Sequence, residues 1–471
     1  MEPIRRLLRS LRERTNGLFS ITLLSLLVAL YGPGGQNIGQ PGGVTALRAQ
    51  IARLKGAARA GAPAAGLDAW QALEYDVSLR AYPNDVVDWA ALKQGIARRD
   101  AMPNYHSKLL QYWEFLGPRS LTPPQQTGYG TGKIAGRIND VAFDPHNSST
   151  IYAAAPAGGV WKSTDSGSTW TALTDAWSDL STSSITVDPH DSNTIYVGTG
   201  DFDGYGGIGQ GVMRSTDGGA TWSSWGPSAA SSYAVRHILV DPEDSTIVTL
   251  ITGRGASGAG QVWRSDDGGE TWTAVIAVNA AWSDLVCSGK DANGVRVYYA
   301  CAGGTNAQVW KSTDRGATWT QMTTPMRTGA STADTCDLAV SPTAPGAVYL
   351  LGTGDKKVWR STNYGLNWQD MTSGALISAD WSQASYDFYL TCSTNGSADV
   401  LYVGLVDLLV STNAGTSWSS LMLANTGNDL AHVYQHGMAI DPSNASHTLA
   451  ANDGGVYSVN LAGNGSGTFS S

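Results

Sequence analysis

The chain has 471 residues, of which 56 are glycine, 17 are tryptophan and only 15% are charged. This composition is typical of a turn-rich β protein with aromatic packing, and it excludes a mainly helical or disordered chain. The formal net charge of −9 argues against a nucleic acid as partner. A single core rarely serves a chain of this length, so we expect small repeated units.

The N-terminal segment has the pattern of an export signal. Several arginines, from Arg5 to Arg14, precede an almost wholly apolar run at residues 18–31. This run is short for a membrane span and suits the core of a signal peptide. We therefore expect residues 1–32 to be a signal peptide, or a signal anchor because no clear cleavage site follows near Gly32. The protein is then secreted or surface-exposed, and it meets the membrane only through that possible anchor.

A linker and a helical leader are expected next, over residues 33–108. Residues 33–43 are rich in glycine and proline, whereas residues 44–66 and 69–98 have helical spacing interrupted by proline. The remaining residues, 109–471, hold the repeats.

One phrase, close to Ser-x-Asp-x-Gly-x-Thr-Trp, recurs through the rest of the chain. Its opening serines are separated by 52, 50, 47, 49, 50 and 47 residues. They are Ser163, Ser215, Ser265, Ser312, Ser361, Ser411 and Ser458. A period near fifty residues with strand-like content is typical of a propeller.

Each unit reads as four short antiparallel strands. The first ends in Asp-Pro or Ser-Pro, as at Asp144-Pro145, and the fourth begins at the Thr-Trp of the repeated phrase. Seven such units predict an all-β, seven-bladed propeller over residues 109–471. The seventh unit ends soon after Ser458, and we expect it to lack its fourth strand. We expect residues 112–116 to complete it, unless the natural chain extends beyond Ser471.

The repeated phrase itself is expected to stabilise the fold. Its acidic or amide side chain can accept backbone N–H bonds within its own turn, and its glycine can adopt a positive φ. The tryptophan that follows would wedge between blades and bury a large area. The expected structural acceptors are Asp165, Asp217, Asp267, Asp314, Asn363 and Asn413.

Candidate functional residues lie toward the opposite face. One position of the first strand is repeatedly occupied by a carboxylate or a histidine. It lies four residues before the Asp or Ser of the Asp-Pro or Ser-Pro pair that ends the strand. Asp140, His237 and Asp337 occupy this position, and Asp284 and Asp387 fall at the matching place in units that lack the Pro pair. Clustered carboxylates can bind a cation or carry acid/base chemistry. The alternative, which we favour, is that each one accepts backbone N–H bonds from the neighbouring blade.

The loops after the second strands supply a second set of candidates. Asp201, Asp355 and Asp453 are the candidate catalytic residues. Arg254, His432, His436 and Asn452 are further candidate binding residues. The His432–His436 spacing is weak evidence for a metal on a loop, so we expect neither a metal nor another cofactor. Glutamate is nearly absent from the repeats, so a two-carboxylate glycosidase would rely on aspartate.

The four cysteines are few for an exported chain of this size. Cys287 and Cys301 fall in consecutive expected strands, where they either pair or remain buried thiols. Cys336 and Cys392 complete the set.

Residues 112–471 resemble Asp-box (BNR-repeat) propellers, which include sortilin-like VPS10-type domains, bacterial sialidases and xyloglucanases. The phrases at residues 136–138, 157–164 and 452–457 are most similar to those of secreted bacterial sortilin-like proteins. The xyloglucanase resemblance implies a catalytic Asp two residues before a Gly-Gly pair, where this chain has Pro156 and Asn452.

The sialidase resemblance implies an arginine triad and a Tyr-Glu pair, for which no glutamate is suitably placed. We therefore expect a monomeric propeller that binds an extracellular protein or polysaccharide without catalysis. The alternative is a glycoside hydrolase or lyase of this propeller type that uses aspartates.

Overall fold

The computed structural model describes residues 135–203, 209–227, 233–253, 260–291, 293–304, 307–326, 334–421, 431–462 and 467–470. All of them belong to the second of the two units into which the chain divides, residues 117–471. The expected signal segment, the leader, residues 112–116 and Arg254 lie outside the described residues.

The described residues form antiparallel β-sheets, with one short 3-10 helix, η4 (Gly374–Leu376). Two four-stranded sheets come first in the chain. They are β1 (Asp140–Asp144), β2 (Asn147–Ala155), β3 (Gly159–Ser163) and β4 (Thr171–Ala172), then β5 (Thr182–Asp188), β6 (Asp191–Thr199), β7 (Val212–Ser215) and β8 (Ser223–Ser224).

Three four-stranded sheets occupy the C-terminal half. The first two are β16 (Cys336–Val340), β17 (Val348–Gly352), β18 (Lys357–Ser361) and β19 (Gln369–Asp370), then β20 (Tyr389–Thr394), β21 (Asp399–Gly404), β22 (Leu408–Ser411) and β23 (Ser419–Ser420). The third is β24 (Gln435–Asp441), β25 (Asn444–Asn452), β26 (Gly455–Leu461) and β27 (Gly467–Ser470).

The sheet between these groups has seven strands because one long strand serves two units. It contains β9 (Ala234–Asp241), β10 (Asp244–Gly253), β11 (Gly260–Ser265), β12 (Thr273–Lys290), β13 (Arg296–Gly303), β14 (Gln308–Ser312) and β15 (Thr320–Gln321). The first part of β12 pairs with β11, and its second part pairs with β13. The all-β prediction is confirmed, whereas the count of seven blades stays a prediction.

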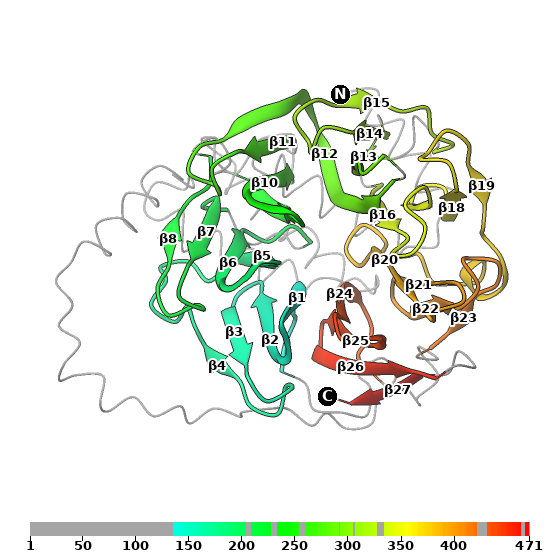
Figure 1. Ribbon diagram of the computed structural model, residues 1–471. Coiled ribbons are helices and arrows are strands. Elements are labelled where there is room, and N and C mark those ends of the chain that lie inside the picture. The colour runs from blue at the N-terminus through cyan, green and yellow to red at the C-terminus, as the bar shows by residue number, and fades with distance from the viewer. Residues whose placement is uncertain are drawn as a thin grey trace, which may run out of the picture. The chain divides into compact units, whose positions relative to one another are not determined.

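The innermost strands of the sheets follow one another around a closed circuit (Figure 1). In order, β1, β5, β9, β12, β16, β20 and β24 each contact the next, and β24 contacts β1. The first and last sheets are also joined by hydrogen bonds, from Ala135 N–H to Gly454 O at 2.8 Å and from Ile138 N–H to Asn452 O at 3.0 Å. Closure of this kind leaves the sheets with short, protected inner edges and covers the sheet faces that the ends of an open array would expose.

The last unit does have a fourth strand, so the expectation that it lacks one is wrong. β27 pairs with β26 from Ser458↔Ser470 to Leu461↔Gly467. Residues 463–466 are not described, and the chain returns after them to run beside β26. This pairing leaves Ser458–Leu461 without a free edge for residues 112–116, whose own placement is outside the described residues.

The repeated turn is hydrogen-bonded as the sequence predicts. Asp165 Oδ1 accepts bonds from the Ser163 hydroxyl and the Thr169 N–H, both at 2.8 Å, and Ser163 Oγ accepts the Gly167 N–H at 2.9 Å. The same pattern recurs around Asp217, Asp267, Asp314, Asn363 and Asn413. Gly167 has a φ of 88°, as a left-handed turn position requires.

A second repeated contact joins neighbouring sheets at the ends of their first strands. The Ser192 hydroxyl donates to Asp144 at 2.6 Å, and the Ser245 hydroxyl donates to Asp188 at 2.8 Å. The same bond closes the circuit, where the Ser148 hydroxyl donates to Asp441 of the last sheet at 2.5 Å. The aspartate of each Asp-Pro pair therefore also connects adjacent units.

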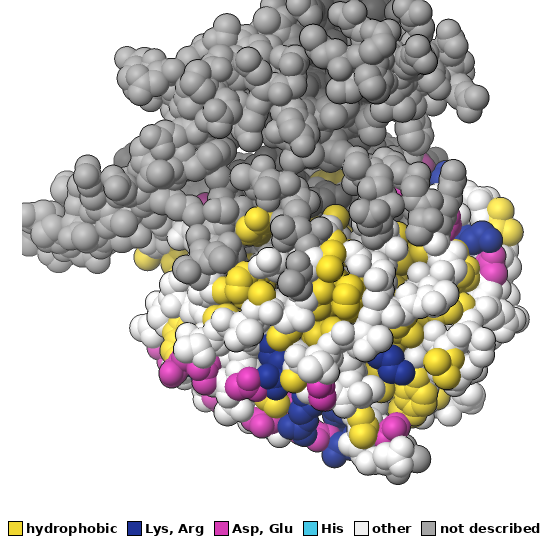
Figure 2. Space-filling model, turned by 90° about the horizontal axis from the view of Figure 1, so that it is seen from above, with side chains coloured by type: hydrophobic (Ala, Val, Ile, Leu, Met, Phe, Trp, Pro, Cys, Tyr) yellow, Lys and Arg dark blue, Asp and Glu magenta, His cyan; other side chains and the backbone are white. Residues whose placement is uncertain are grey.

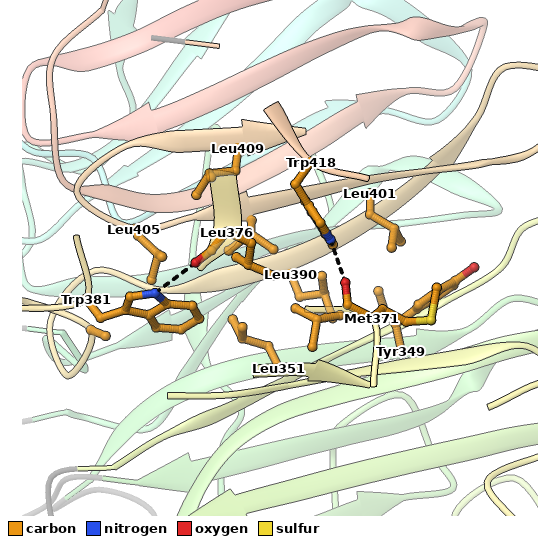
Figure 3. Packing of buried hydrophobic residues seen from close by; sticks show 14 of the residues in the cluster. Tyr349, Leu351, Met371, Leu376, Trp381, Leu390, Leu401, Leu405, Leu409 and Trp418 are labelled. Atoms are coloured by element: carbon orange, nitrogen blue, oxygen red, sulfur yellow. Dashed lines mark hydrogen bonds between the residues drawn. The ribbon is translucent and has the colours of Figure 1, made fainter. Parts of the chain in front are cut away.

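The apolar core lies between neighbouring sheets, as Figure 3 shows for the cluster between β17 and β22. Trp418 fills this interface and donates its indole N–H to Met371 O at 2.9 Å, while Trp381 donates to Leu376 O at 3.3 Å. Trp418 is the tryptophan of a repeated phrase and is buried between sheets as expected, whereas those of the other phrases are half-buried: Trp170, Trp222, Trp272, Trp319 and Trp368.

All four cysteines are free thiols, so the suggested Cys287–Cys301 pairing is not formed. The two residues share a sheet but are not paired across it, because Cys287 is opposite Tyr298 and Cys301 is opposite Asp284.

On the surface, basic and acidic side chains lie next to one another on the face in Figure 2. Among the described residues, Glu243 contacts Lys290, Arg296 and Arg315.

Candidate functional site

Three carboxylates of the innermost strands each accept a hydrogen bond from the backbone of the next unit. Asp140 Oδ2 accepts the Ile185 N–H at 2.9 Å, and Asp284 Oδ2 accepts the Leu338 N–H at 2.8 Å. Asp337 Oδ1 accepts the Leu390 N–H at 3.1 Å. The favoured interpretation of this position, as an acceptor for the neighbouring unit's backbone, is thus confirmed for these three.

Asp387 does not occupy the same position, which corrects the alignment drawn from the sequence. Tyr389 stands opposite Gly404 as Asp337 stands opposite Leu351, so Asp387 precedes the matching position by two residues. Its unit lacks the Asp-Pro pair that marks the register in most others. Both Asp387 carboxylate oxygens are buried with no hydrogen-bond partner among the described residues. Burial raises the pKa of Asp387 well above its usual range.

A cavity of about 340 Å³ lies along the innermost strands. Its polar lining includes Asn139, Asp140, Arg236, His237, Asp284 and Asp337. His237 Nδ1 lies 2.8 Å from Asp284 Oδ1. Burial alone would lower the pKa of His237, but its hydrogen bond with Asp284 and the charge of that carboxylate raise it. The carboxylate of Asp284 therefore favours the protonated form of this imidazole.

A charged network lies where the loops after β6 and β25 meet the innermost strands. His436 is fully buried between two carboxylates, with Nε2 2.8 Å from Asp453 Oδ1 and Nδ1 3.4 Å from Asp203 Oδ2. Burial alone would lower the pKa of His436, but the bonds and charges of Asp203 and Asp453 raise it to about 9. His436 is therefore positively charged at neutral pH.

Two arginines and a tyrosine extend this network. Arg236 donates to Asp203 at 3.0 Å, and Arg137 is ion-paired with Asp201. Tyr386 receives a bond from Arg137 at 3.2 Å and donates its hydroxyl to Asp453 Oδ1 at 2.8 Å. The network therefore alternates cations and carboxylates across several units. We name it the mouth network: Arg137, Asp201, Asp203, Arg236, Tyr386, His436 and Asp453.

Asp453 is the carboxylate of this network that is most open to solvent. Its side chain is 24% exposed, compared with 7% for Asp201 and 1% for Asp203. Burial alone would raise the pKa of Asp453, but the hydrogen bond and charge of His436, followed by Tyr386 and Arg137, lower it. Asp453 is thus an ionised carboxylate that solvent can reach.

The other candidates have different surroundings. Asp355 lines a separate small cavity with Asp334 and Gly354. Asn452 accepts the Gly454 N–H at 2.9 Å, which shapes its own turn, and His432 Nδ1 lies 2.9 Å from Val433 O. Within the described ranges, no three His, Cys, Asp or Glu side chains are placed to share a metal ion.

The sequence predicted Asp201, His436 and Asp453 as candidate site residues, but it did not predict the hydrogen bonds and ion pairs that they make. Tyr386 was not among the candidates, because it lies in the segment between η4 and β20, which has no counterpart in the repeat. Arg236 directly precedes His237, and its role depends on Asp203, which is adjacent only in three dimensions. A repeat pattern cannot reveal such contacts, since each residue occurs in one unit only.

The fold and these contacts define an all-β protein of the propeller type with a charged network at one end of its innermost strands. A family model described as "Sortilin, neurotensin receptor 3" (Sortilin-Vps10) matches residues 158–275 and 260–403. These matches cover more than half of the chain, which therefore belongs to the Sortilin-Vps10 family.

Several similar proteins are named as xyloglucanases. One from Paenibacillus sp. is 27% identical over 180 residues, which are 32% of this chain and 17% of that protein. Another, from Hypocrea jecorina (strain QM6a), is 26% identical over 176 residues, or 35% of this chain and 20% of that protein. The chain therefore spans only about a fifth of the length of these relatives.

Solved structures of similar fold include an ancestral GH74 enzyme, with a TM-score of 0.55 and 20% identity over 74% of this chain and 47% of that one. The GH74 xyloglucanase from Xanthomonas campestris has a TM-score of 0.52 and 19% identity over 74% and 55% of the two chains. At this identity the likeness shows the fold. Among the described residues, no helix has the length and apolar character needed to cross a membrane.

Proposed function

We propose that the protein is a glycoside hydrolase that binds a polysaccharide at the mouth network. The observation that carries this proposal is the setting of Asp453, an ionised carboxylate that is open to solvent and fixed by His436 and Tyr386. The names of the xyloglucanase relatives support a β-glucan of the xyloglucan type as the substrate.

Glycoside hydrolysis needs two carboxyl groups with different protonation states. Asp453 suits the part that must be ionised, which is activation of water or direct attack on the sugar. Asp201 and Asp355 remain the candidates for the acid that protonates the leaving oxygen. Asp201 lies in the mouth network but is buried and ion-paired with Arg137, whereas Asp355 is partly exposed but lines a separate cavity, so neither is preferred for this part.

We propose seven blades, with β9 to the first part of β12 as the third and the second part of β12 to β15 as the fourth. Residues 1–32 would direct the protein out of the cytoplasm, where a polysaccharide is accessible.

The test is a reducing-end assay of the purified protein on xyloglucan and other polysaccharides. The Asp453→Asn variant should lose at least about a hundredfold in rate, the range typical of a lost acid/base group. Asp175→Asn, at an exposed position outside the network, is the matched control and should keep full activity. Absence of product with the unaltered protein would refute hydrolysis.

A second candidate function is glycan or protein binding without catalysis. It is favoured by the internal contacts of Asp201, Asp203 and Asp453, each of which holds an arginine, histidine or tyrosine of the fold. Retarded migration of the protein in a polysaccharide-containing gel, without any reducing ends, would support this function.

A further inference from the structure

Two of the four cysteines lie in one interface between neighbouring sheets. Cys301 belongs to β13 and Cys336 to β16, and these two strands contact each other although residues 302–335 separate the cysteines in the sequence. Both thiols are free and fully buried, and they pack in one apolar cluster that also contains Tyr299 and Leu338. Because alternate residues of a strand share a face, the two thiols lie on the faces that meet in this interface.

A single hydroxyl group contacts both sulfur atoms. Ser283 Oγ lies 3.7 Å from Cys301 Sγ and 3.2 Å from Cys336 Sγ, and it donates to Cys336 O at 2.6 Å. The thiols also interact with each other, because burial, followed by a hydrogen bond with Cys336 and the charge of that group, raises the pKa of Cys301 well above its usual range. The two thiols are therefore next to each other in the interface.

The backbones of the two strands approach closely at this end of the interface. A Cβ placed on Gly303 would meet Asp334 O and would lie 2.6 Å from Thr335 Cα. Gly303 follows Cys301 by two residues, and Thr335 directly precedes Cys336. A disulfide needs Cα atoms about 4.4–6.8 Å apart, which sheets packed at the usual spacing of about 10 Å do not allow. The backbone contact beside these cysteines brings the strands closer than that spacing.

We propose that Cys301 and Cys336 form a disulfide that links two neighbouring units of the ring when the protein folds in the presence of a disulfide oxidant. One cysteine thiolate attacks a sulfur of the external disulfide, which releases one thiol and leaves a mixed disulfide on the protein. The other cysteine thiolate then attacks the protein sulfur, so that the Sγ–Sγ bond forms and the second external thiol leaves. Two protein thiols are oxidised, one external disulfide is reduced, and the two thiol protons pass to the released thiols.

Burial determines when this reaction takes place. Both thiols are shielded from solvent in the folded protein, and the raised pKa of Cys301 disfavours the thiolate that the exchange needs. The oxidant therefore reaches the pair only while the interface is open, during folding or a local opening. Disulfide oxidants are present in the compartments where exported proteins fold. Once the bond has formed, the closed interface protects it from external thiols in the same way.

The experiment exposes the full chain to a mixture of oxidised and reduced glutathione over a urea series that ends at the unfolding midpoint. The mixture keeps the exchange reversible, and the urea opens the interface. Remaining thiols are alkylated after removal of the glutathione, and the peptides are analysed by mass spectrometry without reduction. We expect the loss of two of the four free thiols and a peptide pair that joins Cys301 to Cys336. Four remaining thiols at the midpoint, or glutathione attached to both residues in place of the internal bond, would overturn the proposal.

The other two cysteines provide the controls. Cys287 and Cys392 belong to different sheets, and each Sγ lies against the carbonyl oxygen of the next residue, at 3.4 and 3.5 Å. Cys336→Ala should form no internal disulfide, whereas the matched control Cys287→Ala should form the Cys301–Cys336 bond as the unaltered protein does. A bond that involves Cys287 or Cys392 in the unaltered protein would contradict the assignment of the pair.

The melting temperature tests whether the bond is compatible with the native interface. A disulfide that closes the loop of residues 302–335 restricts the unfolded chain, so the oxidised protein should melt at least about 5 °C above the reduced protein. This gain should be absent in Cys336→Ala and present in Cys287→Ala. Neither measurement depends on the proposed hydrolase activity. An oxidised protein that melts no higher than the reduced one would show that the bond distorts the interface, and it would overturn the proposal.

Discussion

His436 should make the stability of the protein depend on pH in a defined direction. The pKa of this side chain rises from 6.5 to about 9 in the folded protein, because Asp203 and Asp453 hold it from both sides. A group whose folded pKa is raised contributes stability below its unfolded pKa and loses it as the pH rises through the folded value. The rise corresponds to about 3 kcal/mol, present below about pH 6.5 and lost by about pH 10.

The measurement is urea denaturation of the unaltered protein and of His436→Gln from pH 6 to pH 10. The difference in unfolding free energy between the two should shrink by about 2–3 kcal/mol over this range. His190→Gln, at an exposed turn position outside the network, is the matched control. A difference that stays constant with pH would show that His436 does not carry the charge inferred for it.

Three further predictions concern the ring of sheets. Ser148→Ala removes the hydroxyl bonded to Asp441 and should lower the unfolding free energy by about 1 kcal/mol, measured by urea denaturation. Gly365→Ala places a side chain at a φ of 82°, where its Cβ would meet Met322 Cε at 2.2 Å; it should cost at least about 1–2 kcal/mol, and a neutral effect would contradict the turn geometry. Truncation after residue 462 removes β27 from β26 and should lower the melting temperature, whereas an unchanged value would show that this pairing contributes nothing.

The repeat period predicted the four-stranded units because every unit carries the same turn chemistry. Each copy of the turn is stabilised by contacts within about ten residues, so a local pattern is sufficient to find it. The sequence could not predict the continuous strand β12 with the same ease. The repeat period implies a break between two units at this point. Residues 273–288 contain no glycine or proline, however, and they continue as one strand from one unit into the next.

The candidate site was predictable only where it repeats. Asp140, Asp284 and Asp337 share a role because they share a register, and that role was correctly inferred from their spacing. Asp387 was misplaced by two residues because its unit lacks the proline that fixes the count elsewhere. Tyr386 had no detectable signal, since it acts in a segment that occurs once and through partners distant in the sequence.

The mouth network shows why the choice between catalysis and binding depends on Asp453. Arg137, Arg236 and His436 are cations that only carboxylates can compensate in a buried setting, so Asp201 and Asp203 are required by the fold whatever the protein does. Asp453 also compensates His436, yet nearly a quarter of its side chain remains exposed, which a purely structural partner does not need. That exposure is the part of the network that its structural role leaves unexplained, and it is where a substrate would meet an ionised carboxylate.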